Sequence, residues 1–155
     1  MYKRILLATD GTPESLHALR EGALIAQAYR AEVCLLVIDR FTAATRMADS
    51  IHPVPLTSPA PELLERGLAR LGRLGLVATG SVAEGDAAML IGKVARDFKA
   101  DLVVVGHRRQ TMLERWWSGS SGAYVTDQIA CSVLVARDII SDEEFESYLE
   151  PDGAS

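Results

Sequence analysis

The sequence feature that most constrains the fold is the stretch ADLVVVG at residues 100–106. It holds four consecutive apolar residues, three of them β-branched, a pattern typical of a strand buried on both faces of a parallel sheet. Gly106 ends this strand, and a glycine there lets the backbone approach a ligand closely. A Gly/Ser cluster at residues 119–122 then opens a predicted helix, whose N–H groups suit an anion. This part of the chain therefore predicts a phosphate site beside the end of a buried strand.

Composition predicts one globular domain without a membrane span. The chain has 155 residues, enough for a single core, and 48% of them are hydrophobic. No apolar run approaches the roughly eighteen residues of a membrane helix. The apolar run after the first charges is too short for a signal-peptide core. We therefore expect a cytoplasmic protein in which Cys34 and Cys131 are reduced thiols.

The negative charge is concentrated at the C-terminal end. Residues 138–155 carry seven of the 21 acidic residues and no lysine or arginine, which leaves 16 basic and 14 acidic residues in the rest of the chain. Neither part presents the strongly basic face of a nucleic-acid-binding protein. We expect neither a nucleic acid nor a membrane as partner.

Strand and helix patterns alternate along the chain. Strands are predicted at 3–9, 32–39, 76–82, 100–106 and 132–136, separated by helical patterns at 12–29, 64–71, 86–98 and 120–130. Thr12 and Asp86 are predicted N-caps. The proline-punctuated residues 40–60 are predicted to form a mobile or ligand-covering loop. The alternation predicts an α/β fold, an open five-stranded parallel sheet with helices on both faces.

Ligands of such sheets bind beyond the carboxyl ends of the strands, at the point where the strand order reverses. The sequence does not fix the strand order. If the order is 3-2-1-4-5, the reversal lies between the first and fourth strands, which have the two most polar ends. Asp10 and Gly106 would then face each other across one crevice.

The acidic tail carries one more helix signal. Residues 141–144 form a predicted capping box, with Ile140 and Phe145 as a hydrophobic staple, so a short helix is expected before residue 151. Phe145, Tyr148 and Leu149 are expected to pack on the body or on a second subunit. Alternatively, this helix shields the apolar edge of the fifth strand.

Several segments together resemble the universal stress protein family: 5–12 (ILLATDGT), 36–39 (LVID), 84–86 (EGD), 100–106 (ADLVVVG), and 119–120 (GS) with 131–135 (CSVLV). The resemblance covers residues 1–137, taken as one domain that residues 138–155 follow as an acidic tail. It implies a Rossmann-like, adenine-nucleotide α-hydrolase-like fold with sheet order 3-2-1-4-5. In relatives the edge of the fifth strand forms the dimer contact, so a homodimer is expected.

The resemblance also implies a site for ATP, with Mg²⁺, or for AMP. Asp10 and the backbone around Ala8 and Thr9 would meet the ribose and adenine, and the backbone of Val37 would contact the adenine edge. The phosphates would lie against four residues near a helix start: Gly106, Gly119, Ser120 and Ser121. Successive N–H groups at such a place bind anions without charged side chains.

Arg109 departs from the family pattern. Nucleotide-binding members carry G-x2-G-x9-G-[ST], and here Gly106, Gly119 and Ser120 fall in register while Arg109 replaces the second glycine. Two alternatives follow. The Arg109 guanidinium would contact a phosphate, or its Cβ would block the close approach between backbone and ligand that a glycine permits. If the backbone needs a positive φ there, a bulky residue is strained.

The same residues also have structural interpretations, because Asp10 suits a turn, Gly106 a strand end and Ser120 a helix cap. The sequence offers no nucleophile–base pair, metal-ligand cluster or P-loop lysine motif. No catalytic or metal-binding residue is therefore predicted.

Three functions remain in competition. The leading one is a cytoplasmic, adenine-nucleotide-binding regulatory protein of the stress response that is not an enzyme. The second is a dimeric interaction module that binds no nucleotide and contacts an unknown protein partner, with its phosphate site altered by Arg109. The third, an enzyme that adenylates an acid, needs a second substrate site that the sequence does not show.

Overall fold

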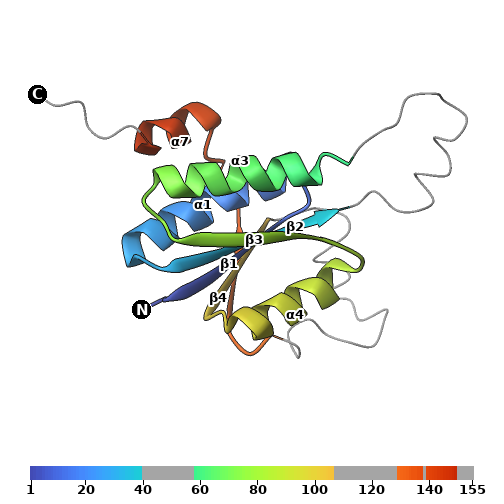
Figure 1. Ribbon diagram of the computed structural model, residues 1–155. Helices are drawn as coiled ribbons and strands as arrows, with labels where there is room; N and C mark the ends of the chain where they lie inside the picture. Colours follow the sequence, from blue (N-terminus) through green and yellow to red (C-terminus); the bar gives the residue numbers. More distant parts are fainter. Residues whose placement is uncertain (40–57, 107–128, 138, 150–155) are drawn as a thin grey trace, which may run out of the picture.

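A five-stranded parallel sheet forms the middle of the molecule (Figure 1). The computed structural model describes residues 1–39, 58–106, 129–137 and 139–149. The strands are β1 (Arg4–Thr9), β2 (Glu32–Asp39), β3 (Ala78–Glu84), β4 (Leu102–Gly106) and β5 (Ser132–Ala136). They lie in the order β3-β2-β1-β4-β5, and every neighbouring pair is parallel. The predicted α/β class and strand order are confirmed.

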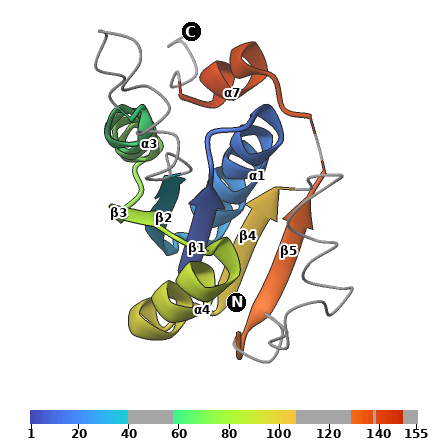
Figure 2. The ribbon, with the colours of Figure 1, turned by 90° about the vertical axis from the view of Figure 1, so that its right-hand side faces the viewer.

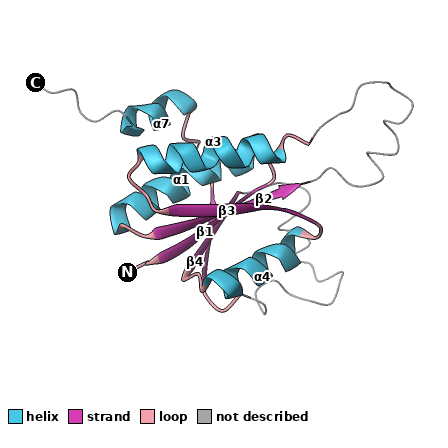
Figure 3. Cartoon of the chain, viewed as in Figure 1, coloured by secondary structure: helices cyan, strands magenta, loops and turns pink. Residues whose placement is uncertain are grey.

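Helices cover both faces of this sheet, as predicted. They are α1 (Pro13–Tyr29), α3 (Ala60–Arg73), α4 (Ala87–Phe98) and α7 (Asp142–Leu149). Figures 2 and 3 show α1, α3 and α7 on one side of the sheet and α4 on the other. Most of the helix predicted at 120–130, and most of the loop predicted at 40–60, lies outside the described residues.

Alternate residues of the central strands enter two separate cores. In β1, Ile5 and Leu7 pack with α1 and α3, whereas Leu6 and Ala8 pack with α4. A strand presents successive side chains to opposite faces, so a strand covered twice has to be apolar at every position. The continuous apolar run of β1 is the direct result, because residues 5–9 are all buried.

The third strand begins two residues later than predicted, at Ala78 rather than at residue 76. The reason lies in the preceding helix, because the N–H of Leu76 still donates to the carbonyl of Leu71 in α3. Gly75, with a φ of +76°, makes the left-handed turn that this helix ending needs. The apolar character of Leu76 and Val77 in the sequence did not show that the hydrogen bonding of α3 extends to Leu76.

The two predicted N-caps behave differently. The Asp86 carboxylate accepts a hydrogen bond from the N–H of Met89 at 3.0 Å, so this cap is confirmed. Thr12 occupies the N-cap position of α1, but its side chain makes no cap bond. Its hydroxyl donates instead to Asp10 Oδ1 at 2.6 Å. The Thr12 side chain is thus directed toward the Asp10 carboxylate, and its oxygen accepts no N–H from the first turn of α1.

The tail helix α7 packs on the body of the same chain. Ser141 Oγ accepts the N–H of Glu144 at 3.0 Å, which starts the helix as the capping box predicts. Phe145 and Leu149 are buried in the core that α1 and α3 form, whereas Tyr148 is half exposed and is not part of that core. Figure 2 shows α7 over α1 rather than along the outer edge of β5.

Arginines of α1 and α3 hold α7 through Asp142. Arg20 Nη2 and Arg70 Nη1 lie 2.8 and 2.9 Å from the same carboxylate oxygen. The hydrogen bond from Arg70, followed by the charges of Arg70 and Arg20, holds the pKa of Asp142 below its usual value. These ion pairs add a charge-dependent component to the packing of the helix.

We expect Asp142→Asn to lower the free energy of unfolding at pH 7 by at most about 1 kcal/mol, because the carboxylate is exposed and screened. A carboxyl whose pKa is lower in the folded state stabilises the fold above its unfolded pKa and stops doing so as the pH falls through the folded pKa. The difference between variant and wild type should therefore shrink below about pH 4. Urea unfolding across this range measures it, and a difference independent of pH would contradict the assignment.

Candidate functional site

The carboxyl ends of β1 and β4 lie side by side where the strand order reverses. Leu7 pairs with Val104 in the register of these two strands. Just beyond, a hollow with about 20 Å³ of space is lined on one side by Asp10 and on another by Gly106. The structure thus brings together two residues that are 96 positions apart in the sequence, at the place where parallel sheets bind ligands.

Hydroxyl groups fix the turn between β1 and α1. Thr12 donates to Asp10, Ser15 Oγ donates to the carbonyl of Thr12 at 2.9 Å, and Thr9 Oγ1 lies 2.8 Å from Ser15 Oγ. The N–H of Gly11 donates to Thr9 Oγ1 at 3.1 Å. Each hydroxyl has one proton. Because the proton of Ser15 goes to the Thr12 carbonyl, Thr9 is the donor in its hydrogen bond to Ser15. The Asp10 carboxylate is held in place because Thr12 binds it through both its N–H and its hydroxyl.

Gly106 permits a close approach between β4 and the first turn of α1. A Cβ at this position would lie 2.7 Å from both the carbonyl oxygen of Glu14 and the Cα of Ser15. These are backbone atoms, which cannot rotate away as a side chain does. The glycine therefore has a packing reason to be here, and any side chain would push the start of α1 away from the sheet.

The other wall of the hollow is apolar. Ala8, Ile38 and Val105 come from the ends of three neighbouring strands, and Ile91 comes from α4. All four side chains belong to the core on the α4 face of the sheet. The hollow thus has an apolar side, and a polar side formed by a carboxylate and a turn rich in hydroxyls.

The remaining predicted site residues have three different outcomes. Ala8 and Thr9 line the hollow. Val37 is 1% exposed, pairs with Thr9 on one side and with Val82 on the other, and lies two residues before the end of β2. The other four, Arg109, Gly119, Ser120 and Ser121, lie outside the described residues.

Several lining residues were not predicted from the sequence. They are Thr12, Glu14, Ser15, Ile38, Ile91 and Val105. For Thr12, Glu14 and Ser15 a signal was present, because they occupy the start of the helix that follows Asp10. For Ile38, Ile91 and Val105 no local signal existed, since core isoleucines and valines look alike wherever a strand ends.

The described residues show no constellation for metal or thiol chemistry. Among them, no group of three histidine, cysteine, aspartate or glutamate side chains is arranged to hold a metal ion. Cys34 and Cys131 are free thiols, and burial raises the pKa of both, so they are protonated and weakly nucleophilic at neutral pH. None of the helices in the described ranges has the length and apolar character required to cross a membrane.

Comparison with known proteins identifies the family to which the chain is similar. The model of the universal stress protein family matches residues 1–137. A universal stress protein of Methanocaldococcus jannaschii is 30% identical over 141 residues, which cover 88% of this chain and 83% of the relative.

Two solved structures share the fold. A universal stress protein crystallised in complex with cAMP superposes with a TM-score of 0.63 at 23% identity, covering 88% of this chain and 97% of the other. A universal stress protein family protein of Arabidopsis thaliana with AMP bound gives a TM-score of 0.58 at 16% identity, covering 92% and 97%. With the family model matching most of the sequence and the fold agreeing, the chain belongs to the universal stress protein family.

Proposed function

We propose that this protein is an adenine-nucleotide-binding regulatory protein of the stress response that binds ATP or AMP and has no enzymatic activity. The observation that carries the proposal is that the turn with Asp10 and the strand end with Gly106 meet at the reversal of strand order, where parallel sheets bind ligands. Two relatives of the same fold were crystallised with cAMP and AMP, which supports an adenine nucleotide as the ligand class.

The two sides of the hollow suit different parts of the ligand. The apolar wall of Ala8, Ile38 and Val105 provides a surface for the adenine ring. Asp10 suits the ribose, because a carboxylate only accepts hydrogen bonds and ribose hydroxyls donate them. In this proposal the backbone around Ala8 and Thr9 also meets the nucleoside, and the backbone of Val37 meets the adenine edge.

The phosphates need hydrogen-bond donors or positive charges. The charged residues among the described lining of the hollow, Asp10 and Glu14, are both acidic. We assign the phosphates to Gly106 and to the predicted segment with Arg109, Gly119, Ser120 and Ser121. For ATP, Mg²⁺ would neutralise part of the phosphate charge beside these carboxylates. This part of the proposal depends on the sequence motif.

Isothermal titration with AMP and with ATP plus Mg²⁺ tests the proposal. Asp10→Asn should weaken binding about tenfold, because the ribose loses its charged acceptor. Asp97→Asn is a matched control, since Asp97 is an exposed carboxylate of α4 that pairs with Lys93. No heat with either nucleotide up to millimolar concentration would reject the proposal, as would equal affinities for the two variants.

The second candidate function, a dimeric interaction module without nucleotide, depends on Arg109 standing where relatives have a glycine. If the guanidinium contacts a phosphate, we expect Arg109→Gly to weaken AMP binding about tenfold, because one charge-assisted hydrogen bond is lost. If Arg109 closes the site instead, the wild type does not bind and Arg109→Gly creates binding. Side-by-side titration of the two proteins separates these functions.

We further propose that the protein is cytoplasmic and forms a homodimer through the edge of β5. Ser132 and Val133 are exposed on this edge strand, and Val133 keeps 38% of its surface accessible. An exposed apolar edge readily pairs with another chain. The molar mass in solution tests the dimer.

A further inference from the structure

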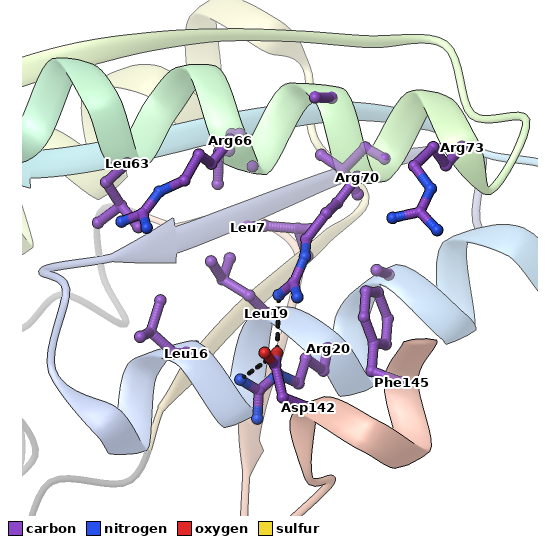
Figure 4. Close-up of a pocket in the computed structure, with 15 residues that line it drawn as sticks. Leu7, Leu16, Leu19, Arg20, Leu63, Arg66, Arg70, Arg73, Asp142 and Phe145 are labelled. Carbon is purple, nitrogen blue, oxygen red and sulfur yellow. Dashed lines mark hydrogen bonds and ion pairs between the residues drawn. The ribbon is translucent and has the colours of Figure 1, made fainter. Parts of the chain in front are cut away.

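A second cavity lies on the opposite face of the sheet from α4, between α1, α3 and α7 (Figure 4). Its volume is about 470 Å³, within the range of pockets that hold small organic ligands. It shares none of its lining residues with the hollow at Asp10. It can therefore bind a ligand of a different kind from the nucleotide proposed above.

The interior of this cavity is made of leucine side chains. Leu7 of β1 and Leu35 of β2 form its floor, and each is 1% exposed. Figure 4 shows Leu16 and Leu19 of α1 and Leu63 of α3 around the same space. No neutral polar side chain is among the described lining residues. Such a surface favours an aliphatic chain and gives a nucleobase no hydrogen-bonding partners.

The rim of the cavity is charged and has an excess of positive charge. Among the described lining residues are four guanidinium groups, those of Arg20, Arg66, Arg70 and Arg73, and one carboxylate, that of Asp142. Figure 4 shows Asp142 between Arg20 and Arg70, on the side where α7 packs. Even with Glu62 and Glu146, which pair with rim arginines, the positive charges outnumber the negative ones. An anionic group is therefore favoured at this rim.

Arg66 is the rim arginine best placed to bind such a group. Its contact with Glu62 is 3.9 Å long, beyond hydrogen-bonding distance, and its side chain is 68% exposed. By contrast, Arg20 and Arg70 make hydrogen bonds of 2.6 to 2.8 Å that hold α7. Arg66 can thus reorient onto a ligand without releasing the helix.

We propose that this cavity binds a medium-chain aliphatic carboxylate. Its chain lies along Leu7, Leu16 and Leu63, and its carboxylate accepts hydrogen bonds from Arg66. A guanidinium and a carboxylate form a charge-assisted, bidentate pair, and the leucine surface supplies the hydrophobic part of the affinity. This site is additional to the nucleotide site and does not depend on it.

Isothermal titration with decanoate tests this site, with butanoate as the short-chain control. Decanoate should bind, and butanoate should bind far more weakly because it buries less apolar surface. Arg66→Ala should weaken decanoate binding at least about tenfold, because the charge-assisted pair with the carboxylate is lost. Arg96→Ala is the matched control, because it removes an exposed arginine of α4 on the other face. Asp142→Asn should strengthen binding, since it removes the negative charge at the rim.

The location is tested by amide chemical shifts on decanoate addition. The shifts should centre on α1 and α3, around Leu16 and Leu63. In an AMP titration, Arg66→Ala should have the same affinity as the wild type. Absence of decanoate binding to the wild type overturns the proposal. Equal losses in Arg66→Ala and Arg96→Ala, or shifts centred elsewhere, also overturn it, and all of these results leave the nucleotide proposal untouched.

Discussion

Replacing Gly106 with alanine is expected to lower the free energy of unfolding by about 1–3 kcal/mol and to reduce AMP affinity to an undetectable level. The added Cβ would lie 2.7 Å from backbone atoms of Glu14 and Ser15, so the start of α1 has to move. Because Asp10 and Thr12 belong to the turn that leads into α1, this movement also displaces the hollow. Urea unfolding and nucleotide titration measure the two effects.

Gly72→Ala is the matched control for this prediction. Gly72 lies in α3, and a Cβ there would meet no atom within 4 Å. Alanine is favoured over glycine inside a helix by about 1 kcal/mol, so this variant should be more stable than wild type and bind nucleotide equally well. If Gly106→Ala proved as stable as wild type, the close contact between β4 and α1 would be wrong.

Replacing Phe145 with alanine is expected to cost about 3–5 kcal/mol of unfolding free energy. The ring is 3% exposed in the core formed with α1 and α3, and the guanidinium carbon of Arg70 lies 5.8 Å from its centroid. The loss therefore combines a cavity with a lost cation–π contact. Thermal or urea unfolding measures it.

Tyr148→Ala provides the control on the same helix. Tyr148 is 50% exposed, and its replacement should change the unfolding free energy by less than about 0.5 kcal/mol. If Phe145→Ala were as mild as Tyr148→Ala, α7 would not be part of the folded core. The body and the tail helix would then be independent.

Much of the fold could be predicted because a doubly covered parallel strand leaves an unambiguous pattern. β1, β2 and β4 are apolar at nearly every position, since both faces of each strand are buried. β3 shows the opposite case, because this edge strand is mostly exposed, and its start was misplaced by two residues. Its boundary depends on how α3 ends at Gly75, which hydrophobicity does not encode.

The role of individual small residues was harder to predict. Gly67 and Gly72 appear equivalent in the sequence, as two glycines that weaken one helix. In the structure a Cβ at Gly67 would lie 2.5 Å from Leu35 Cδ2, whereas one at Gly72 would meet nothing. Gly67 therefore lets α3 pack closely on β2. Only the packing distinguishes the two positions.

Reasoning from strand ends and from the family resemblance pointed to Ala8, Thr9, Asp10 and Gly106, but not to the apolar residues across the hollow. Ile38 and Ile91 line the hollow because β2 and α4 lie next to β1 in space. The leucine cavity needs three helices far apart in the sequence to meet over one sheet face. Neither arrangement leaves a periodic signal in the sequence.

An adenine nucleotide is expected to bind at the adjoining carboxyl ends of β1 and β4, and a crystal structure of the protein grown with AMP would locate it. Electron density is expected for adenine against Ile38 and Val105, for ribose beside Asp10, and for phosphate beside Gly106. A crystal grown at saturating AMP with no nucleotide density at the ends of these strands, or with the nucleotide bound elsewhere, would contradict it.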